Sequence, residues 1–119
     1  MLSAEHRLRT DKDFSRVHTR GRIMRGPHLA LRLAPNTLKV SRFGFLVGKK
    51  VSKSSVARKK ALRRLREATR ASLPLLRGGY DVVVLVRPSV LKQPYANLKM
   101  ELASLFQRSG LLKRSQPSS

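Results

Sequence analysis

Hydrophobic and polar positions divide the chain into segments with two different periods. Apolar and polar residues alternate over residues 28–34 and again over 38–47, as in strands with one buried face. The segment 81–87 is DVVVLVR, and its apolar residues on both faces indicate a central strand. Apolar residues recur with the helical period over 55–72 and 94–108, so these two segments are predicted to be helices.

A further short helix is predicted near the N-terminus. Thr10 is a suitable N-cap, Asp13 stands at the third helical position, and the helix is expected to end near Gly21. Segment 22–26 is either a short strand or a connection, so the predicted order of elements is αβββαβα or αββαβα. Gly110 suits the C-cap of the last helix. Residues 1–110 are predicted to form a single RNA-binding domain, and residues 111–119 a disordered tail.

The strand 38–47, the helix 55–72 and the strand 80–87 form a βαβ unit. Such a crossover joins parallel strands, so we expect a small mixed sheet of about four strands with about three helices, in a two-layer α/β (α+β) sandwich. The two later helices are expected to cover one face of this sheet. The residues of that face are Leu29, Leu31, Leu33, Phe43, Phe45 and Val47.

One side of the helix 55–72 is strongly basic. Lys59, Arg63, Arg66 and Arg70 recur there at helical spacing, with Lys60 beside them. The opposite, apolar side comprises Ala57, Ala61, Leu65, Ala68 and Ser72, flanked by Leu62 and Thr69. Like charges three or four residues apart cost about 0.2–0.5 kcal/mol per pair. A merely solvated face normally mixes both signs, so a negatively charged partner is the stronger interpretation.

The whole chain shares this excess of positive charge. Lys and Arg number 27 against six Asp and Glu, which gives a net charge of +21 over 119 residues and implies a polyanionic partner, either nucleic acid or an anionic membrane. No apolar run is long enough to span a bilayer, and the N-terminus lacks the apolar core of a signal peptide. Since the chain has no cysteine, a disulfide framework is excluded and a cytoplasmic location is expected.

Candidate catalytic side chains are scarce. The carboxylates are Glu5, Asp11, Asp13, Glu67, Asp81 and Glu101. Only Asp11 and Asp13 are close in sequence, and helix capping accounts for Asp13. The histidines, His6, His18 and His28, lack ligand spacing, and no glycine-rich phosphate-binding motif is present. A metal-dependent nuclease needs clustered carboxylates, so we expect no catalytic residues and no metal site in the protein itself.

The basic helix also bears on the kind of nucleic acid. It lacks the preceding helix and short turn of a helix-turn-helix, and its basic face has no Asn or Gln to recognise bases. Recognition of backbone and shape favours structured RNA over DNA. Phe14 has two interpretations, an anchor of the first helix or a surface on which a base stacks, and both hold if Phe14 lies at the edge of a cleft.

Five segments of the chain match a family pattern in order and spacing. They are HRLR at 6–9, DF at 13–14, RFGFLVGKKVSKSSV at 42–56, RKKALRRLRE at 58–67 and GYDVVVLVRP at 79–88. Over these segments the chain resembles the protein subunit of bacterial ribonuclease P. The resemblance implies a two-layer sandwich with a left-handed βαβ crossover, similar to a domain of a ribosomal small-subunit protein.

The resemblance also implies a ribonucleoprotein enzyme with catalytic RNA and precursor tRNA as partners, and with no membrane or DNA partner. The RNA subunit would remove the 5′ leader of the precursor, with Mg²⁺ held mainly by that RNA and the substrate. The leader cleft would comprise Phe14, His18, Ala30, Arg32 and Leu46. The catalytic-RNA surface would comprise Lys49, Lys50, Lys53, Arg58, Lys59, Lys60, Arg63 and Arg66. Lys59 and Leu62 stand where the family usually has Asn and Lys.

The sequence therefore leaves three functions to be distinguished. The first is the protein subunit of ribonuclease P, an endoribonuclease of tRNA 5′ maturation. The second is a non-catalytic protein that binds structured RNA, such as a small ribosomal protein. The third is a stand-alone nuclease, which the small number of carboxylates disfavours.

Overall fold

The computed structural model describes residues 3–113, and its main elements follow the order αβββαβα. They are α1 (Asp11–Arg20), β1 (Arg22–Arg25), β2 (Leu29–Pro35), β3 (Arg42–Leu46), α2 (Ser55–Ser72), β4 (Tyr80–Val86) and α3 (Tyr95–Arg108). Three short 3₁₀ helices accompany them: η1 (Ala4–His6), η2 (Leu73–Leu75) and η3 (Pro88–Lys92). Of the two predicted orders, the one with a strand in segment 22–26 is therefore confirmed.

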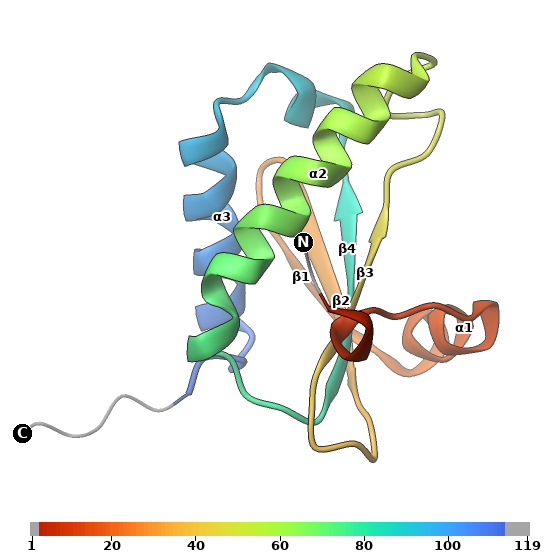
Figure 1. Cartoon of the computed structure of the whole chain (residues 1–119), viewed down its shortest axis with the longest axis vertical. Helices are drawn as coiled ribbons and strands as arrows, with labels where there is room; N and C mark the ends of the chain where they lie inside the picture. Colours follow the sequence, from red (N-terminus) through yellow and green to blue (C-terminus); the bar gives the residue numbers. More distant parts are fainter. Residues whose placement is uncertain (1–2, 114–119) are drawn as a thin grey trace, which may run out of the picture.

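The four strands form one mixed sheet in the order β1-β2-β4-β3. β2 pairs antiparallel with β1 and β4, whereas β3 pairs parallel with β4, as the βαβ unit predicts. Figure 1 shows α2 and α3 together over one face of the sheet, with α1 apart from them. This arrangement is the expected two-layer sandwich with its parallel crossover through α2.

The main core lies between the sheet and the helices α2 and α3. Leu29, Leu31, Leu33 and Phe43 are buried there, and Phe45 and Val47 are half-buried against them, as the alternating pattern predicts. The helices contribute Ala61, Leu65, Ala68, Leu98, Leu102, Leu105 and Phe106. The rings of Phe43 and Phe106 meet edge to face, with their centroids 6.0 Å apart, a geometry that aromatic pairs prefer.

The strand predicted over 38–47 begins later, at Arg42. The physical reason is the side chain of Asn36, which organises a turn. Its Oδ1 accepts the Leu38 backbone N–H at 2.8 Å, and its Nδ2 donates to the Val40 carbonyl oxygen at 3.2 Å. Side-chain hydrogen bonds of this kind compete with strand pairing, so residues 38–40 connect β2 to β3 instead of extending the sheet.

The expectation of a disordered tail from residue 111 is wrong for residues 111–113. Gly110, at φ +83°, follows α3, and its N–H donates to the Gln107 carbonyl while the Leu111 N–H donates to the Phe106 carbonyl. This is a Schellman motif, which characteristically brings the residue after the glycine onto the helix. Leu111 is accordingly fully buried in the main core. The rest of the predicted tail, 114–119, lies outside the described residues.

Candidate nucleic-acid interface

A hollow of about 300 Å³ lies between α1 and the sheet face opposite the main core. Its lining residues are Phe14, Ser15, His18, Arg32, Leu46, Val83 and Leu85. We call this the α1 hollow. Its floor is apolar, since Val83 and Leu85 belong to the central strand β4, and its rim carries the cation Arg32 and the imidazole of His18. An apolar floor beside a cation suits an unpaired base attached to a phosphate.

The aromatic wall of the α1 hollow is fixed by close packing against β3. Phe14 is half-buried in a small cluster with the buried side chains of Leu8, Val17 and Val83. Its ring lies so close to Gly44 that a Cβ built on that glycine would stand 2.3 Å from the Phe14 Cζ atom. Phe14 is therefore an anchor of α1 and also lines the hollow, the position in which both interpretations can hold, and the stacking of a base on it stays a prediction.

Four of the five residues predicted for the leader cleft line the α1 hollow: Phe14, His18, Arg32 and Leu46. Ala30 is on the same face of β2, opposite Leu85 in β4, but it is buried and does not line the hollow. Arg32 is held in place by donating from Nη1 to the His18 carbonyl oxygen at 3.3 Å.

Sequence reasoning missed three lining residues, Ser15, Val83 and Leu85. The strand 81–87 is apolar on both faces, so the pattern alone does not show that α1 leaves part of one face open. The alternation of residues in β3 nevertheless contained a sign of this open part of the face. Gly44 presents no side chain on the α1 face, and its partner in the parallel register is Val83.

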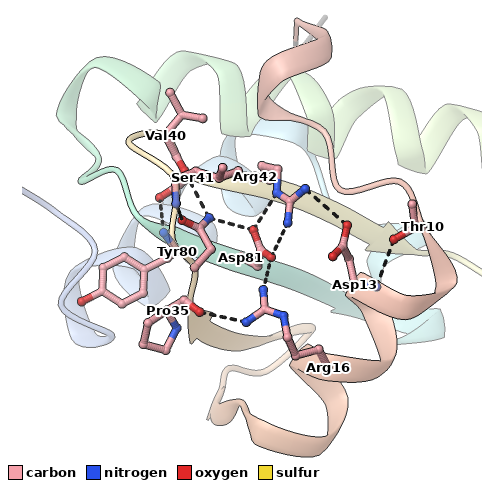
Figure 2. Close-up of polar contacts among 11 residues, drawn as sticks. Thr10, Asp13, Arg16, Pro35, Val40, Ser41, Arg42, Tyr80 and Asp81 are labelled. Atoms are coloured by element: carbon pink, nitrogen blue, oxygen red, sulfur yellow. Dashed lines mark hydrogen bonds and ion pairs between the residues drawn. The ribbon is translucent and has the colours of Figure 1, made fainter.

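A buried carboxylate holds α1 to the sheet (Figure 2). Asp81 is fully buried and accepts hydrogen bonds from Arg42, from Nε to Oδ1 at 2.9 Å and from Nη2 to Oδ2 at 2.7 Å. Arg16 of α1 donates to the same Oδ2, and Asn36 donates to Oδ1 at 2.8 Å. Arg42 also pairs with Asp13 of α1 at 3.3 Å. We call these five residues the Asp81 network.

The Asp81 network keeps its carboxylate ionised. Burial alone would raise the pKa of Asp81, but hydrogen bonds from Arg42 and Asn36, and the charges of Arg42 and Arg16, outweigh it and hold that pKa below its usual value. Arg16 of α1, Arg42 of β3 and Asn36 thus converge on a single buried anion of β4, and Asp13 of α1 joins the network through Arg42. The network fixes the start of α1, and with it the position of Phe14, relative to the sheet.

The second surface is the outer face of α2. Ser54 caps the helix by accepting the Ala57 N–H on its side chain at 3.2 Å, and the first turn contains no acidic residue. Of the eight residues predicted for catalytic RNA, six are exposed: Lys49, Lys50, Lys53, Lys59, Lys60 and Arg63. Arg58 and Arg66 are half-buried. Arg64 serves the fold instead, because its Nη2 donates to the Gln93 carbonyl oxygen at 2.7 Å.

A shallow hollow of about 520 Å³ follows this basic face, lined by Lys59, Leu62, Arg63, Arg66 and Glu67. Glu67 contributes the one carboxylate of this lining, and it pairs with Arg70 at 2.5 Å. An exposed ion pair of this kind contributes little free energy. The face therefore stays strongly cationic and offers several donors for phosphate oxygens.

Within residues 3–113, no group of three or more His, Asp or Glu side chains lies close enough together to hold a metal ion. Asp13, one of the two carboxylates that are close in sequence, pairs with Arg42. In the same part of the chain, no helix is both long and apolar enough to cross a membrane.

Comparison with known proteins identifies relatives over nearly the whole chain. Residues 2–110 match the family model described as Ribonuclease P. The ribonuclease P protein component of Chloroflexus aurantiacus is 39% identical over 108 residues, covering 90% of this chain and 79% of the relative.

Two solved structures share the fold. The RNase P protein of Staphylococcus aureus matches with a TM-score of 0.83 at 19% identity, covering 91% of this chain and 98% of that one. The RNase P protein of Thermotoga maritima, in complex with 1-(4-fluorophenyl)-2-thiourea, matches with a TM-score of 0.79 at 25% identity, covering 86% and 98%.

Proposed function

The chain belongs to the ribonuclease P protein family, and from this premise we propose how it takes part in ribonuclease P. It binds the catalytic RNA through the basic face of α2 and the 5′ leader of precursor tRNA through the α1 hollow. The RNA subunit then hydrolyses the phosphodiester that joins leader and tRNA. The observation that carries this proposal is the presence of two separate cation-bearing surfaces, neither of which has a set of catalytic side chains.

The α1 hollow suits a single strand rather than a duplex. An unpaired base can lie on the Phe14 ring, and one such stack is worth about 1–3 kcal/mol. Arg32 at the rim can pair with the adjoining phosphate. The bases of a duplex are already stacked on one another, so a leader that is single-stranded gains more from this surface.

The α2 face suits a folded RNA. Its cations project from one rigid helix, and contacts to phosphates fix the orientation of a partner without reading its sequence. Magnesium ions expected for the reaction would be held by the RNA and the substrate, because the carboxylates of residues 3–113 offer no cluster that fits such an ion.

Cleavage of precursor tRNA tests the proposal directly. The precursor is incubated with the cognate catalytic RNA, with the protein, and with both, at low magnesium. We expect efficient cleavage only in the combined reaction, because the protein supplies cations where phosphates of the two RNAs come together. Cleavage that is the same with and without protein would favour the non-catalytic RNA-binding alternative. Cleavage by the protein alone would support the stand-alone nuclease.

Arg63→Gln is expected to weaken binding of the catalytic RNA and to flatten its salt dependence. Each lost phosphate contact lowers the slope of log K against log salt by about 0.7–0.9. The measurement is the affinity of the full chain for catalytic RNA over a series of salt concentrations. The matched control is Arg25→Gln. It makes the same charge change in β1, at the edge of the sheet opposite β3. Equal slopes for the two variants would mean that Arg63 is only solvated.

A further inference from the structure

The segment before α1 runs alongside β3 as a short parallel extension of the sheet. Arg7 forms a bridge with Phe43, and the Leu8 N–H donates to the Phe43 carbonyl oxygen at 2.9 Å. The Leu8 side chain is buried on the α1 side, with Val17. Because side chains alternate along an extended segment, Arg7 and Arg9 leave it on the side opposite Leu8. They border a hollow shared with Arg66 of α2 and a second one shared with Glu5 and Asp13.

These two arginines meet a third one from α2. A hollow of about 430 Å³ is lined by Arg7, Arg9 and Arg66, with Phe14 and Phe45 among the apolar residues beside them. Arg9 is exposed, and Arg7 and Arg66 are half-buried. No acidic residue of the described chain lines this hollow. Three arginines from two chain segments thus line one concave surface, which we call the three-arginine hollow.

The three-arginine hollow lies between the two proposed RNA surfaces and adjoins both. It shares Phe14 with the α1 hollow and Arg66 with the hollow on the basic face of α2. An RNA strand that leaves the α1 hollow toward α2 must cross the β3 edge of the sheet. Arg7 and Arg9 are placed along that edge.

We propose that the three-arginine hollow binds a phosphate group of an RNA backbone that passes between the α1 hollow and α2. This inference rests on the proposed function and adds Arg7 and Arg9 to the residues that contact RNA. A guanidinium group binds phosphate through two parallel N–H donors. Three arginines line the hollow, and among its described lining residues no side chain would select a base, so the contact is independent of sequence. The phosphate comes from the leader or from the catalytic RNA.

Single substitutions in the full chain test this site. Arg9→Gln removes an exposed charge, and Arg7→Gln removes the neighbouring one while keeping the backbone bridge to Phe43. Arg25→Gln, at the opposite sheet edge, is again the matched control. Two affinities are measured across a salt series. One is that of the protein for catalytic RNA alone, and the other is that of the holoenzyme for precursor tRNA carrying either a long leader or a single leader nucleotide.

We expect Arg9→Gln and Arg7→Gln to lower one of these affinities about three- to tenfold and to reduce its salt slope by about 0.7–0.9. A loss in catalytic-RNA binding assigns the phosphate to that RNA. A loss confined to the long-leader precursor assigns it to the leader. If both variants match Arg25→Gln in both assays, the site does not exist. Thermal unfolding of Arg9→Gln should equal that of the wild type, so a binding loss cannot be attributed to misfolding.

The same experiment separates this inference from the proposed function. If the unsubstituted protein neither binds catalytic RNA nor changes affinity for the precursor, the proposed function fails. If the unsubstituted protein does both and the two arginine variants behave like the control, only the three-arginine hollow is rejected.

Discussion

Replacing Gly44 with alanine is expected to reduce the preference for precursor over mature tRNA by about five- to 150-fold. The added Cβ would stand 2.3 Å from Phe14 Cζ and 2.5 Å from Phe14 Cε1, far inside van der Waals contact, so the ring must leave its position on β3. The range corresponds to the loss of one base stack on Phe14, worth about 1–3 kcal/mol. Overpacking should also lower the free energy of unfolding by about 1–3 kcal/mol.

Gly48→Ala is the matched control, because a Cβ at that position meets no atom within 4 Å. Affinities for precursor and mature tRNA, measured with the holoenzyme, give the preference, and urea denaturation gives the stability. A second variant, Phe14→Ala with Gly44→Ala, removes the clash and should regain part of the stability without regaining the preference. A Gly44→Ala protein that still prefers the precursor as strongly as the wild type would show that the Phe14 ring does not contact the leader.

Replacing Asp81 with asparagine is expected to lower the free energy of unfolding by about 3 kcal/mol at neutral pH. Removing one partner of a buried ion pair typically costs about 3–5 kcal/mol. The lower end applies here because the side chains of Arg16 and Arg42 keep 34% and 23% of their exposure and can be partly rehydrated. Loss of the Asp81 network also frees the start of α1, so leader affinity should fall with stability.

The acid dependence of stability distinguishes this effect from simple loss of packing. The pKa of Asp81 is lowered in the folded protein, so its contribution is fully present above the unfolded-state pKa of about 3.9. That contribution is lost as pH falls through the lower folded-state pKa. The stability difference between wild type and Asp81→Asn should therefore be constant near neutral pH and shrink below about pH 4.

Urea denaturation at neutral and acidic pH measures this difference. Asp11→Asn, which removes an exposed carboxylate from the same helix that supplies Arg16, is the control and should change stability little. A difference between wild type and Asp81→Asn that persists unchanged into acid would mean that the carboxylate charge is not what stabilises the network.

Local patterns were sufficient to predict most of the elements. Thr10 caps α1 by accepting the Asp13 N–H at 3.1 Å, as its position before Asp13 indicates. The late start of β3 and the burial of Leu111 were not foreseen. Both depend on particular hydrogen bonds, those of Asn36 in one case and of Gly110 in the other. Such bonds override a hydrophobic pattern without leaving a periodic signal.

The candidate site was predicted in part, from the family resemblance and not from local patterns. The resemblance assigned Phe14 and Arg32 to a cleft, and both line the α1 hollow. It gave no role to Arg7 or Arg9, although HRLR is one of the matching segments. Their neighbour Arg66 is far along the chain, and nothing in the spacing of HRLR shows that it lies beside α2.

By itself the sequence determined the helices, the strands, the buried sheet face and the cationic face of α2. These features depend on side-chain periodicity within a single segment, which can be followed residue by residue. Only the tertiary structure decided which distant residues meet. Arg16 reaches Asp81 across 65 positions, Phe14 lies on Gly44, and Arg9 lies near Arg66. Strand order and register set these contacts. Because the contacts arise from packing between segments, no local pattern encodes them.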